Sequence, residues 1–193
     1  MTVTRRTLML GSAAGAFGGP PPAEAADPYP PPFRTHHAQF TVLDPREEAG
    51  HIPLRDLEGR RRTLAAYRGK AVLLAFWASW CPPCRRELPI LHRLQNQAKS
   101  EPFVVVPVSL DRDAGTAAAY LRRLRLDGLL SFIDTEGEVA SGPKSKVAPP
   151  FPLYGMPMSY VIDASGRSGG YLTGEADWSA PDALALLHFY ARA

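Results

Sequence analysis

The most informative segment of the sequence is Ala75-Phe-Trp-Ala-Ser-Trp-Cys-Pro-Pro-Cys-Arg-Arg-Glu-Leu-Pro89. The continuous apolar run from Ala71 to Trp77 predicts a short strand that is fully buried. At Pro82 and Pro83 the pattern changes to that of an amphipathic helix. Cys81 therefore lies where a buried strand ends and a helix begins.

The two cysteines of the chain, Cys81 and Cys84, form a C-x-x-C motif at this junction. Free N–H groups and the helix dipole at a helix N-terminus favour an anion, and a thiolate, the reactive form of cysteine, is such an anion. Cys84 lies one turn into the helix, close enough to close a disulfide with Cys81. We expect Cys81 to be the exposed nucleophile and Cys84 the buried resolving thiol.

Two other uses of the cysteines remain open. Zinc sites share the C-x-x-C spacing, but the chain has no further cysteine and no H-x(3–5)-H histidine pair. A purely structural disulfide would close a very short loop and so would remove little chain entropy. Thiol–disulfide chemistry is the interpretation that the motif favours.

Length and charge limit the function classes. A chain of 193 residues is long enough for one well-packed domain and short for two. The net charge of +3 is small and, apart from Arg60-Arg61-Arg62, the basic residues are scattered, which predicts no nucleic-acid partner. The arginine triplet follows a Glu58-Gly59 turn signal and is expected on a solvated hairpin.

Residues 1–25 are predicted to be a signal peptide of the twin-arginine type. Arg5-Arg6 precede a short, glycine- and alanine-rich apolar stretch, and Ala23-Glu24-Ala25 is an A-x-A cleavage signal. Cleavage would release the protein into the periplasm, an oxidising compartment. An uncleaved membrane anchor is the alternative, although the apolar stretch is too short to span a bilayer.

Residues 26–38 are rich in proline and predict an extended leader before a domain at residues 39–193. His36-His37 in this leader could bind a metal, but a pair of solvated histidines is the simpler interpretation. Strands are expected at 40–43, in a hairpin over 52–64, at 71–77, 103–110 and 129–134, and in a second hairpin at 159–162 and 169–172.

Three helices are expected between these strands. The first covers residues 82–98, contains Pro89, and buries Cys84, Leu88, Leu91 and Leu94 or Ala98; the second is capped by Asp113. The last is expected to start at Ser179, with Asp182 as its capping partner, and to bury Leu184, Leu187 and Ala191. The order predicts an α/β fold, a mixed sheet with helices on both faces.

The sequence resembles the TlpA/ResA-like branch of extracytoplasmic thiol–disulfide oxidoreductases in the thioredoxin superfamily. The resemblance covers about residues 40–190. Besides W-C-x-x-C and Pro89, it rests on four segments: Leu54-Arg-Asp-Leu-Glu-Gly59, Tyr67-Arg-Gly-Lys70, Gly155-Met-Pro-Met-Ser-Tyr-Val-Ile-Asp163 and Gly174-Glu-Ala-Asp-Trp178. It implies a thioredoxin-like fold, a central mixed β-sheet flanked by helices, with an N-terminal β-hairpin extension.

The resemblance also implies roles for individual residues. Pro157 would be a cis-proline beside the cysteine pair, and Met156 would present its backbone to a substrate strand. Trp80, Pro82 and Pro83 would support the pair. Thioredoxin carries a buried carboxylate at the position matched by Ala75, so proton delivery to the resolving thiol falls to Glu87; Glu87 could equally be an acid favoured by the helix dipole.

The function that these features predict is a periplasmic dithiol reductase. It would act on disulfides of partner proteins, in cytochrome c maturation or in copper-site assembly of cytochrome oxidase, and need no cofactor beyond the Cys81–Cys84 disulfide. An upstream thiol reductant, membrane-bound, would restore the dithiol. Pro82 and Pro83 lack N–H groups that could stabilise a Cys81 thiolate, which favours a reductant, although Arg85 and Arg86 oppose this effect.

Two alternatives belong to other classes. A copper-binding assembly factor would use Cys81, Cys84, Met156 or Met158, and a histidine as ligands. An oxidase would donate disulfides through the same couple in the opposite direction. Sequence defines the couple but not its direction.

Overall fold

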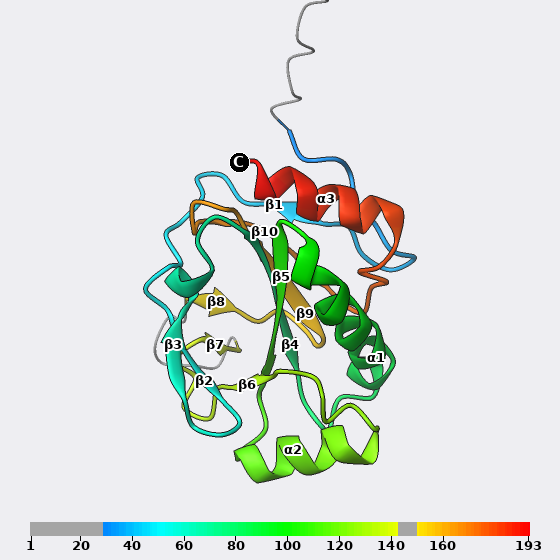
Figure 1. The fold of residues 1–193 in the computed structure, drawn as a ribbon. Helices are drawn as coiled ribbons and strands as arrows, with labels where there is room; N and C mark the ends of the chain where they lie inside the picture. The colour runs from blue at the N-terminus through cyan, green and yellow to red at the C-terminus, as the bar shows by residue number, and fades with distance from the viewer. Residues whose placement is uncertain (1–28, 143–149) are drawn as a thin grey trace, which may run out of the picture.

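The computed structural model describes residues 29–142 and 150–193. Its centre is an eight-stranded mixed sheet with the order β1-β10-β9-β4-β5-β6-β2-β3, and three helices lie around it (Figure 1). The predicted thioredoxin-like α/β fold is confirmed. The predicted signal peptide, residues 1–25, lies outside the described residues.

The strands of the large sheet are β1 (Thr41–Val42), β2 (Pro53–Asp56), β3 (Arg61–Thr63), β4 (Ala71–Trp77), β5 (Phe103–Ser109), β6 (Phe132–Ile133), β9 (Met158–Ile162) and β10 (Ser168–Thr173). A separate pair is formed by β7 (Ala140–Ser141) and β8 (Phe151–Pro152). The helices are α1 (Pro82–Gln97), α2 (Ala114–Arg123) and α3 (Pro181–Ala191), and short 3₁₀ turns lie at Leu64–Tyr67 and Ala98–Ser100. Among the described residues, none of the helices is long and apolar enough to cross a membrane.

Strand β4 is the centre of the molecule, as the sequence predicts. All seven of its residues are buried, and it pairs in parallel with β5 and antiparallel with β9. Leu73 and Ala75 pack against the helices α1 and α3 on one face, whereas Leu74 and Phe76 pack on the other. Because side chains alternate along a strand, a strand with apolar layers on both sides must be apolar throughout.

The second face of the sheet differs from the prediction. The core cluster on that face, which includes Leu74, contains Ile52, Leu54, Leu64 and Phe151, and none of its described members comes from α1, α2 or α3. The N-terminal hairpin, the turn at Leu64–Tyr67 and the β7–β8 pair therefore cover this face in place of a helix. Helix α2 packs instead with Trp77 and the start of α1.

The N-terminal β-hairpin is confirmed. Strands β2 and β3 pair antiparallel, and Gly59 in the turn has a φ of 87°, which favours glycine. Strand β2 also pairs with β6 and so joins the hairpin to the sheet. Arg60 and Arg61 are exposed, as expected of a solvated hairpin, whereas Arg62 is half-buried with its guanidinium carbon 5.7 Å from the centre of the Phe132 ring. Strand β1 does not belong to this hairpin, since it pairs with β10.

Helix α1 begins at Pro82 and buries Cys84, Leu88, Leu91 and Leu94, as predicted, with Pro89 inside it. Asp113 caps α2, because its Oδ1 accepts from the Thr116 N–H at 2.8 Å. The predicted strand over 129–134 is reduced to Phe132–Ile133.

The predicted start of the last helix is wrong, and of the residues predicted to be buried only Leu187 is fully so. Helix α3 begins at Pro181, its N-cap Ala180 makes no side-chain bond, and the Ser179 hydroxyl bonds Asp177 instead. Its buried residues are Ala183, Leu186, Leu187 and Tyr190, while Leu184 and Ala191 are only partly buried. The helix is apolar almost all round, so hydrophobic periodicity does not define a single face. Proline at the first helical position then determines where it starts.

The proline-rich leader is not separate from the domain. Phe33 is buried in the core with its ring 5.1 Å from that of Trp178, and Arg34 and Gln39 form an antiparallel bridge. His36 and His37 on this segment are exposed. The large aromatic side chain of Phe33 is the physical reason, because its burial outweighs the extended preference of the prolines before it.

Candidate active site

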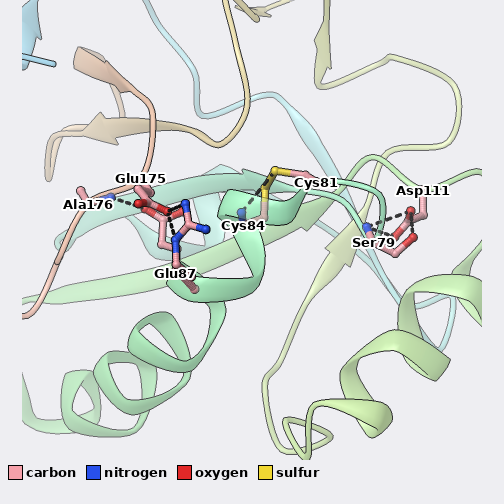
Figure 2. The surroundings of a disulfide bond; sticks show 8 residues. Ser79, Cys81, Cys84, Glu87, Asp111, Glu175 and Ala176 are labelled. Atoms are coloured by element: carbon pink, nitrogen blue, oxygen red, sulfur yellow. Dashed lines mark hydrogen bonds and ion pairs between the residues drawn. A yellow bond between two sulfur atoms is a disulfide. The ribbon is translucent and has the colours of Figure 1, made fainter. Parts of the chain in front are cut away.

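Cys81 and Cys84 form a disulfide at the junction of β4 and α1, with an S–S distance of 2.07 Å and a Cα–Cα distance of 5.4 Å (Figure 2). Cys81 is the N-cap of α1, and its Sγ accepts from the Cys84 N–H at 3.3 Å. Pro82 and Pro83 occupy the first two helical positions. Since proline has no N–H, Cys84 is the first residue of the helix that can donate to the Cys81 sulfur.

The exposure predicted for Cys81 is wrong in this disulfide-bonded form. Cys81 is 3% exposed and Cys84 is not exposed at all. Both cysteines belong to a buried cluster with Trp77, Ala78 and Leu88, so Cys81 is enclosed as well as Cys84. Trp80, in contrast, is 63% exposed beside the pair.

Glu87 is the buried acid of the site. Its Oε1 accepts from the Ala176 N–H and from the Trp178 indole N–H, each at 3.1 Å (Figure 2 shows the first of these). Burial raises the pKa of Glu87 from 4.5 to about 8, and the two hydrogen bonds only partly oppose this shift. Glu87 is therefore largely protonated at neutral pH and can exchange a proton close to the pKa range of thiols.

Helix geometry places Glu87 near Cys84. Glu87 follows Cys84 by three residues, a spacing that puts two side chains on neighbouring positions of one helix face. The Gly174–Trp178 motif, 87 or more residues later in the chain, supplies its two donors. Sequence predicts Glu87 as the acid, but only the tertiary structure shows how it is buried.

A cavity of about 640 Å³ adjoins Glu87. Its walls come from α1, from residues 175–182 and from the leader segment Phe33–His37. Arg86 and Glu175 form an ion pair of 2.7 Å at its wall, which engages one of the two arginines that follow the cysteines. Arg85 is exposed.

The Met156–Pro157 peptide bond is cis, as the resemblance implies. Pro157 is buried, and its carbonyl accepts from the Gly174 N–H at 2.8 Å. Met156 is half-buried and packs against the cluster that contains the cysteines. The cis-proline loop and the Gly174 loop thus meet beside the cysteine pair.

The methionine and histidine ligands of the copper alternative differ in exposure. Met158 is fully buried, and its Sδ accepts from the Tyr154 N–H at 3.4 Å. His36, His37 and His51 are exposed on other segments. Across residues 29–142 and 150–193, no three His, Cys, Asp or Glu side chains are grouped so that they could hold a metal ion.

Asp111 is a site residue that the sequence analysis misses. It is 2% exposed, and its carboxylate accepts from the Ser79 N–H at 3.1 Å and the Ser79 hydroxyl at 2.7 Å (Figure 2). It also accepts from the Ser109 hydroxyl at 2.9 Å. These bonds tie the loop before Cys81 to the end of β5. Sequence could have indicated Asp111, because it follows β5 as Ser79 follows β4, and the carboxyl ends of these parallel strands meet at the same edge of the sheet.

Residues 45–167 match the profile of the AhpC/TSA family, which is more than half of the chain. The chain belongs to this family. Its thioredoxin-like character, predicted from the W-C-x-x-C and cis-proline segments, is thereby confirmed.

Curated relatives point to the same chemistry. A protein of Geobacillus kaustophilus named thiol-disulfide oxidoreductase ResA is 30% identical over 142 residues, which cover 74% of this chain and 76% of the relative. The ResA protein of Bacillus thuringiensis subsp. konkukian is 26% identical over 146 residues, 74% of this chain and 79% of the relative.

A solved structure supports both fold and chemistry. A protein of Chlorobium tepidum assigned as the thiol:disulfide interchange protein DsbE is 28% identical, with a TM-score of 0.59 over 78% of this chain and 99% of the other. With the disulfide at the start of α1, these relatives identify the protein as a thiol–disulfide oxidoreductase of the ResA/DsbE type.

Proposed function

We propose that this oxidoreductase is a periplasmic dithiol reductase of partner-protein disulfides, acting in cytochrome c maturation or in copper-site assembly of cytochrome oxidase. The observation that supports reduction rather than oxidation is the start of α1. There, two prolines leave the Cys84 N–H as the one donor to the Cys81 sulfur within the first three helical residues. Few donors stabilise the thiolate poorly, and a poorly stabilised thiolate makes the reduced pair a stronger reductant.

The reaction has two steps. The Cys81 thiolate attacks one sulfur of the partner disulfide, the partner's S–S bond breaks, and its second sulfur leaves as a thiolate. Cys84 then loses its proton and attacks Cys81 Sγ, which forms the Cys81–Cys84 disulfide and releases the first partner sulfur. The partner is reduced by two electrons and the cysteine pair is oxidised by two.

Glu87 exchanges the proton of Cys84 in the second step. Its position one turn after Cys84, and a pKa raised by burial to about 8, support this role. Trp80 and the backbone of Met156 beside cis-Pro157 receive the partner chain, which lies along Met156 as an added strand.

The location and the reductant follow from the sequence. The twin-arginine pattern and the A-x-A signal in residues 1–25 support export to the periplasm. No flavin or nicotinamide motif is present in the sequence, so electrons must come from another thiol. We assign that role to a membrane-bound thiol reductant, which can carry electrons from the cytoplasm to an oxidising compartment.

Trapping the mixed disulfide tests this function. Cys84→Ser leaves Cys81 without its resolving thiol, so partner proteins should accumulate in a covalent complex that reductant releases. Cys81→Ser is the matched control and should trap nothing. A wild-type protein that reduces no protein disulfide, or a Cys84→Ser protein that traps no partner in the periplasm, contradicts the proposal, as does stoichiometric Cu(I) binding by the reduced wild type that survives a competing chelator.

A further inference from the structure

A second cavity, of about 430 Å³, lies away from α1 and from Glu87. Its walls carry three tyrosines and three prolines, and we call it the tyrosine groove: Tyr154, Tyr160, Tyr171, Pro45, Pro150 and Pro152. Tyr160 and Phe151 in its floor belong to the core cluster on the face of the sheet that α1 and α3 leave free. No step of the proposed reaction uses this groove.

The tyrosines form a continuous, fixed wall. The rings of Tyr154 and Tyr171 are 5.4 Å apart, and those of Tyr160 and Tyr171 are 5.5 Å apart. The Tyr160 hydroxyl donates to the Pro152 carbonyl at 2.6 Å, which holds that ring in place. Tyr154, at the outer end, is 62% exposed, an unusual exposure for a large aromatic ring.

The rim of the groove carries acidic side chains. Glu47 and Glu48 at the rim are exposed, and the described lining contains no lysine or arginine. Glu48 pairs with Arg68 at 3.3 Å, whereas Glu47 has no ion pair with any described residue. His51 is also exposed and lines the groove.

The groove is connected to the active site. Tyr154 comes two residues before Met156, and its N–H donates to Met158 Sδ on the other side of cis-Pro157. A chain that lies along the Met156 backbone therefore reaches Tyr154 within a few residues. The tyrosine groove is positioned as a continuation of the surface that receives the partner.

We propose that the tyrosine groove binds the segment that flanks the reacting cysteine of a protein substrate, and that it selects an extended, proline-containing segment with a lysine or arginine. This inference rests on the proposed function. Aromatic grooves bind polyproline II segments, whose rings lie against the aromatic faces and whose free backbone carbonyls accept hydrogen bonds. The exposed Tyr154 can donate such a bond through its hydroxyl, and Glu47 attracts the cation.

Peptide substrates test the inference. Each peptide carries one cysteine as a mixed disulfide with thionitrobenzoate, flanked by proline and arginine, by proline and glutamate, or by glycine and serine. The rate constant for release of thionitrobenzoate by the reduced protein is measured for each peptide and for oxidised glutathione. We expect the proline–arginine peptide to react about 10-fold faster than the glycine–serine peptide, the effect of one well-placed anchor.

Two variants separate the contributions of ring and charge. Tyr154→Ser should remove most of the preference for proline, and Glu47→Lys should reduce the preference for arginine over glutamate about 2- to 5-fold, as expected of one exposed charge pair. Glu136→Lys, an exposed acid outside the groove, is the matched control and should leave both preferences unchanged. Reduction of oxidised glutathione should be the same in all four proteins.

The outcomes distinguish the two proposals. A protein that reduces neither glutathione nor any peptide contradicts the proposed function. Rapid reduction of glutathione with equal rates for all three peptides overturns the groove alone. A cysteine-free proline–arginine peptide tests the groove without redox chemistry, since it should bind the oxidised wild type in a fluorescence anisotropy titration and bind Tyr154→Ser at least about fivefold more weakly. Equal binding by both overturns the inference.

Discussion

At the start of α1, Pro82 and Pro83 remove two backbone donors that a Cys81 thiolate would otherwise accept from. The donor that remains is the Cys84 N–H, at 3.3 Å in the oxidised form. The arginines add little to compensate, because Arg86 is paired with Glu175 and Arg85 points to solvent. In the proposed function, the balance of these effects at the Cys81 sulfur favours the reductive direction of the reaction.

Replacing Pro82 by Gly restores one N–H at the first helical position. We expect a lower pKa for the Cys81 thiol and a more oxidising protein, with a wild-type potential nearer the roughly −270 mV of thioredoxin than the −120 mV of a strong oxidant. Equilibration with glutathione buffers measures the potential of each protein, and the pH dependence of alkylation measures the pKa of the Cys81 thiol. Pro89→Ala, in the same helix but away from the sulfurs, is the control. A more reducing Pro82→Gly protein would show that the donor argument is wrong.

Glu87→Gln keeps an oxygen that can accept from Ala176 and Trp178 but cannot titrate. In the wild type, the carboxylate that receives the Cys84 proton forms as pH rises through about 8, so resolution of the mixed disulfide should accelerate over that range. The Gln variant should resolve about 10- to 100-fold more slowly and lose this inflection. Single-turnover rates between pH 6 and 9 measure the resolution step. If the pH dependence of the variant equals that of the wild type, Glu87 has only a structural role.

Two elements hold the cysteine loop. Strand β4 leads into the loop, and Asp111 after β5 holds it by bonding Ser79 (Figure 2). Asp111 also accepts from Ser109 at the end of β5. Two parallel strands that end at the same edge, with a carboxylate between them, make the loop a rigid part of the sheet. Rigidity matters here because the attacking sulfur must meet a partner disulfide in one geometry.

Asp111→Ala should loosen this loop and destabilise the protein. It leaves the Ser79 N–H and two hydroxyls without their acceptor, which should lower the free energy of unfolding by about 2–3 kcal/mol. Asp111→Asn retains one acceptor oxygen and should cost less. Urea unfolding measures both, and alkylation of the reduced cysteines reports the loop. Equal stability of Asp111→Ala and wild type would contradict the argument.

On the scale of the whole molecule, the burial of Glu87 makes stability depend on pH. The pKa of Glu87 is about 8 in the folded protein against 4.5 ordinarily, so between these values the folded state binds more protons than the unfolded one. Its contribution to stability therefore falls as pH rises from about 4.5 and levels off above 8.

The comparison with Glu87→Gln isolates that effect. Relative to wild type, the variant should gain stability as pH rises from 5 to 8.5, by an amount on the order of a few kcal/mol. Denaturant titrations at a series of pH values measure the difference, and Asp182→Asn at the exposed start of α3 serves as the control. A difference that is constant with pH would mean that Glu87 is ionised in the fold at neutral pH.

The sequence specifies the central strand and the C-x-x-C helix through local patterns, whereas the cis-proline was expected only from the resemblance of its segment to a known family. A seven-residue apolar run can only be buried on both faces, paired prolines start a helix, and Gly155-Met-Pro-Met lies in a segment shared with the family. It also indicated Glu87 as the acid. These features depend on neighbours within one or two turns of the chain.

The tertiary structure decided what depends on distant parts of the chain. Two contacts join segments 30 or more residues apart: the bonds of Asp111 to Ser79, and the packing of Phe33 on Trp178. The burial of Cys81 likewise needs the folded chain around it. The face of α3 was undecided for a different reason, since a helix that is apolar all round has no preferred side until its neighbours are in place. The physical reason is the same throughout: burial and hydrogen-bond partners are properties of packing, and no local pattern encodes them.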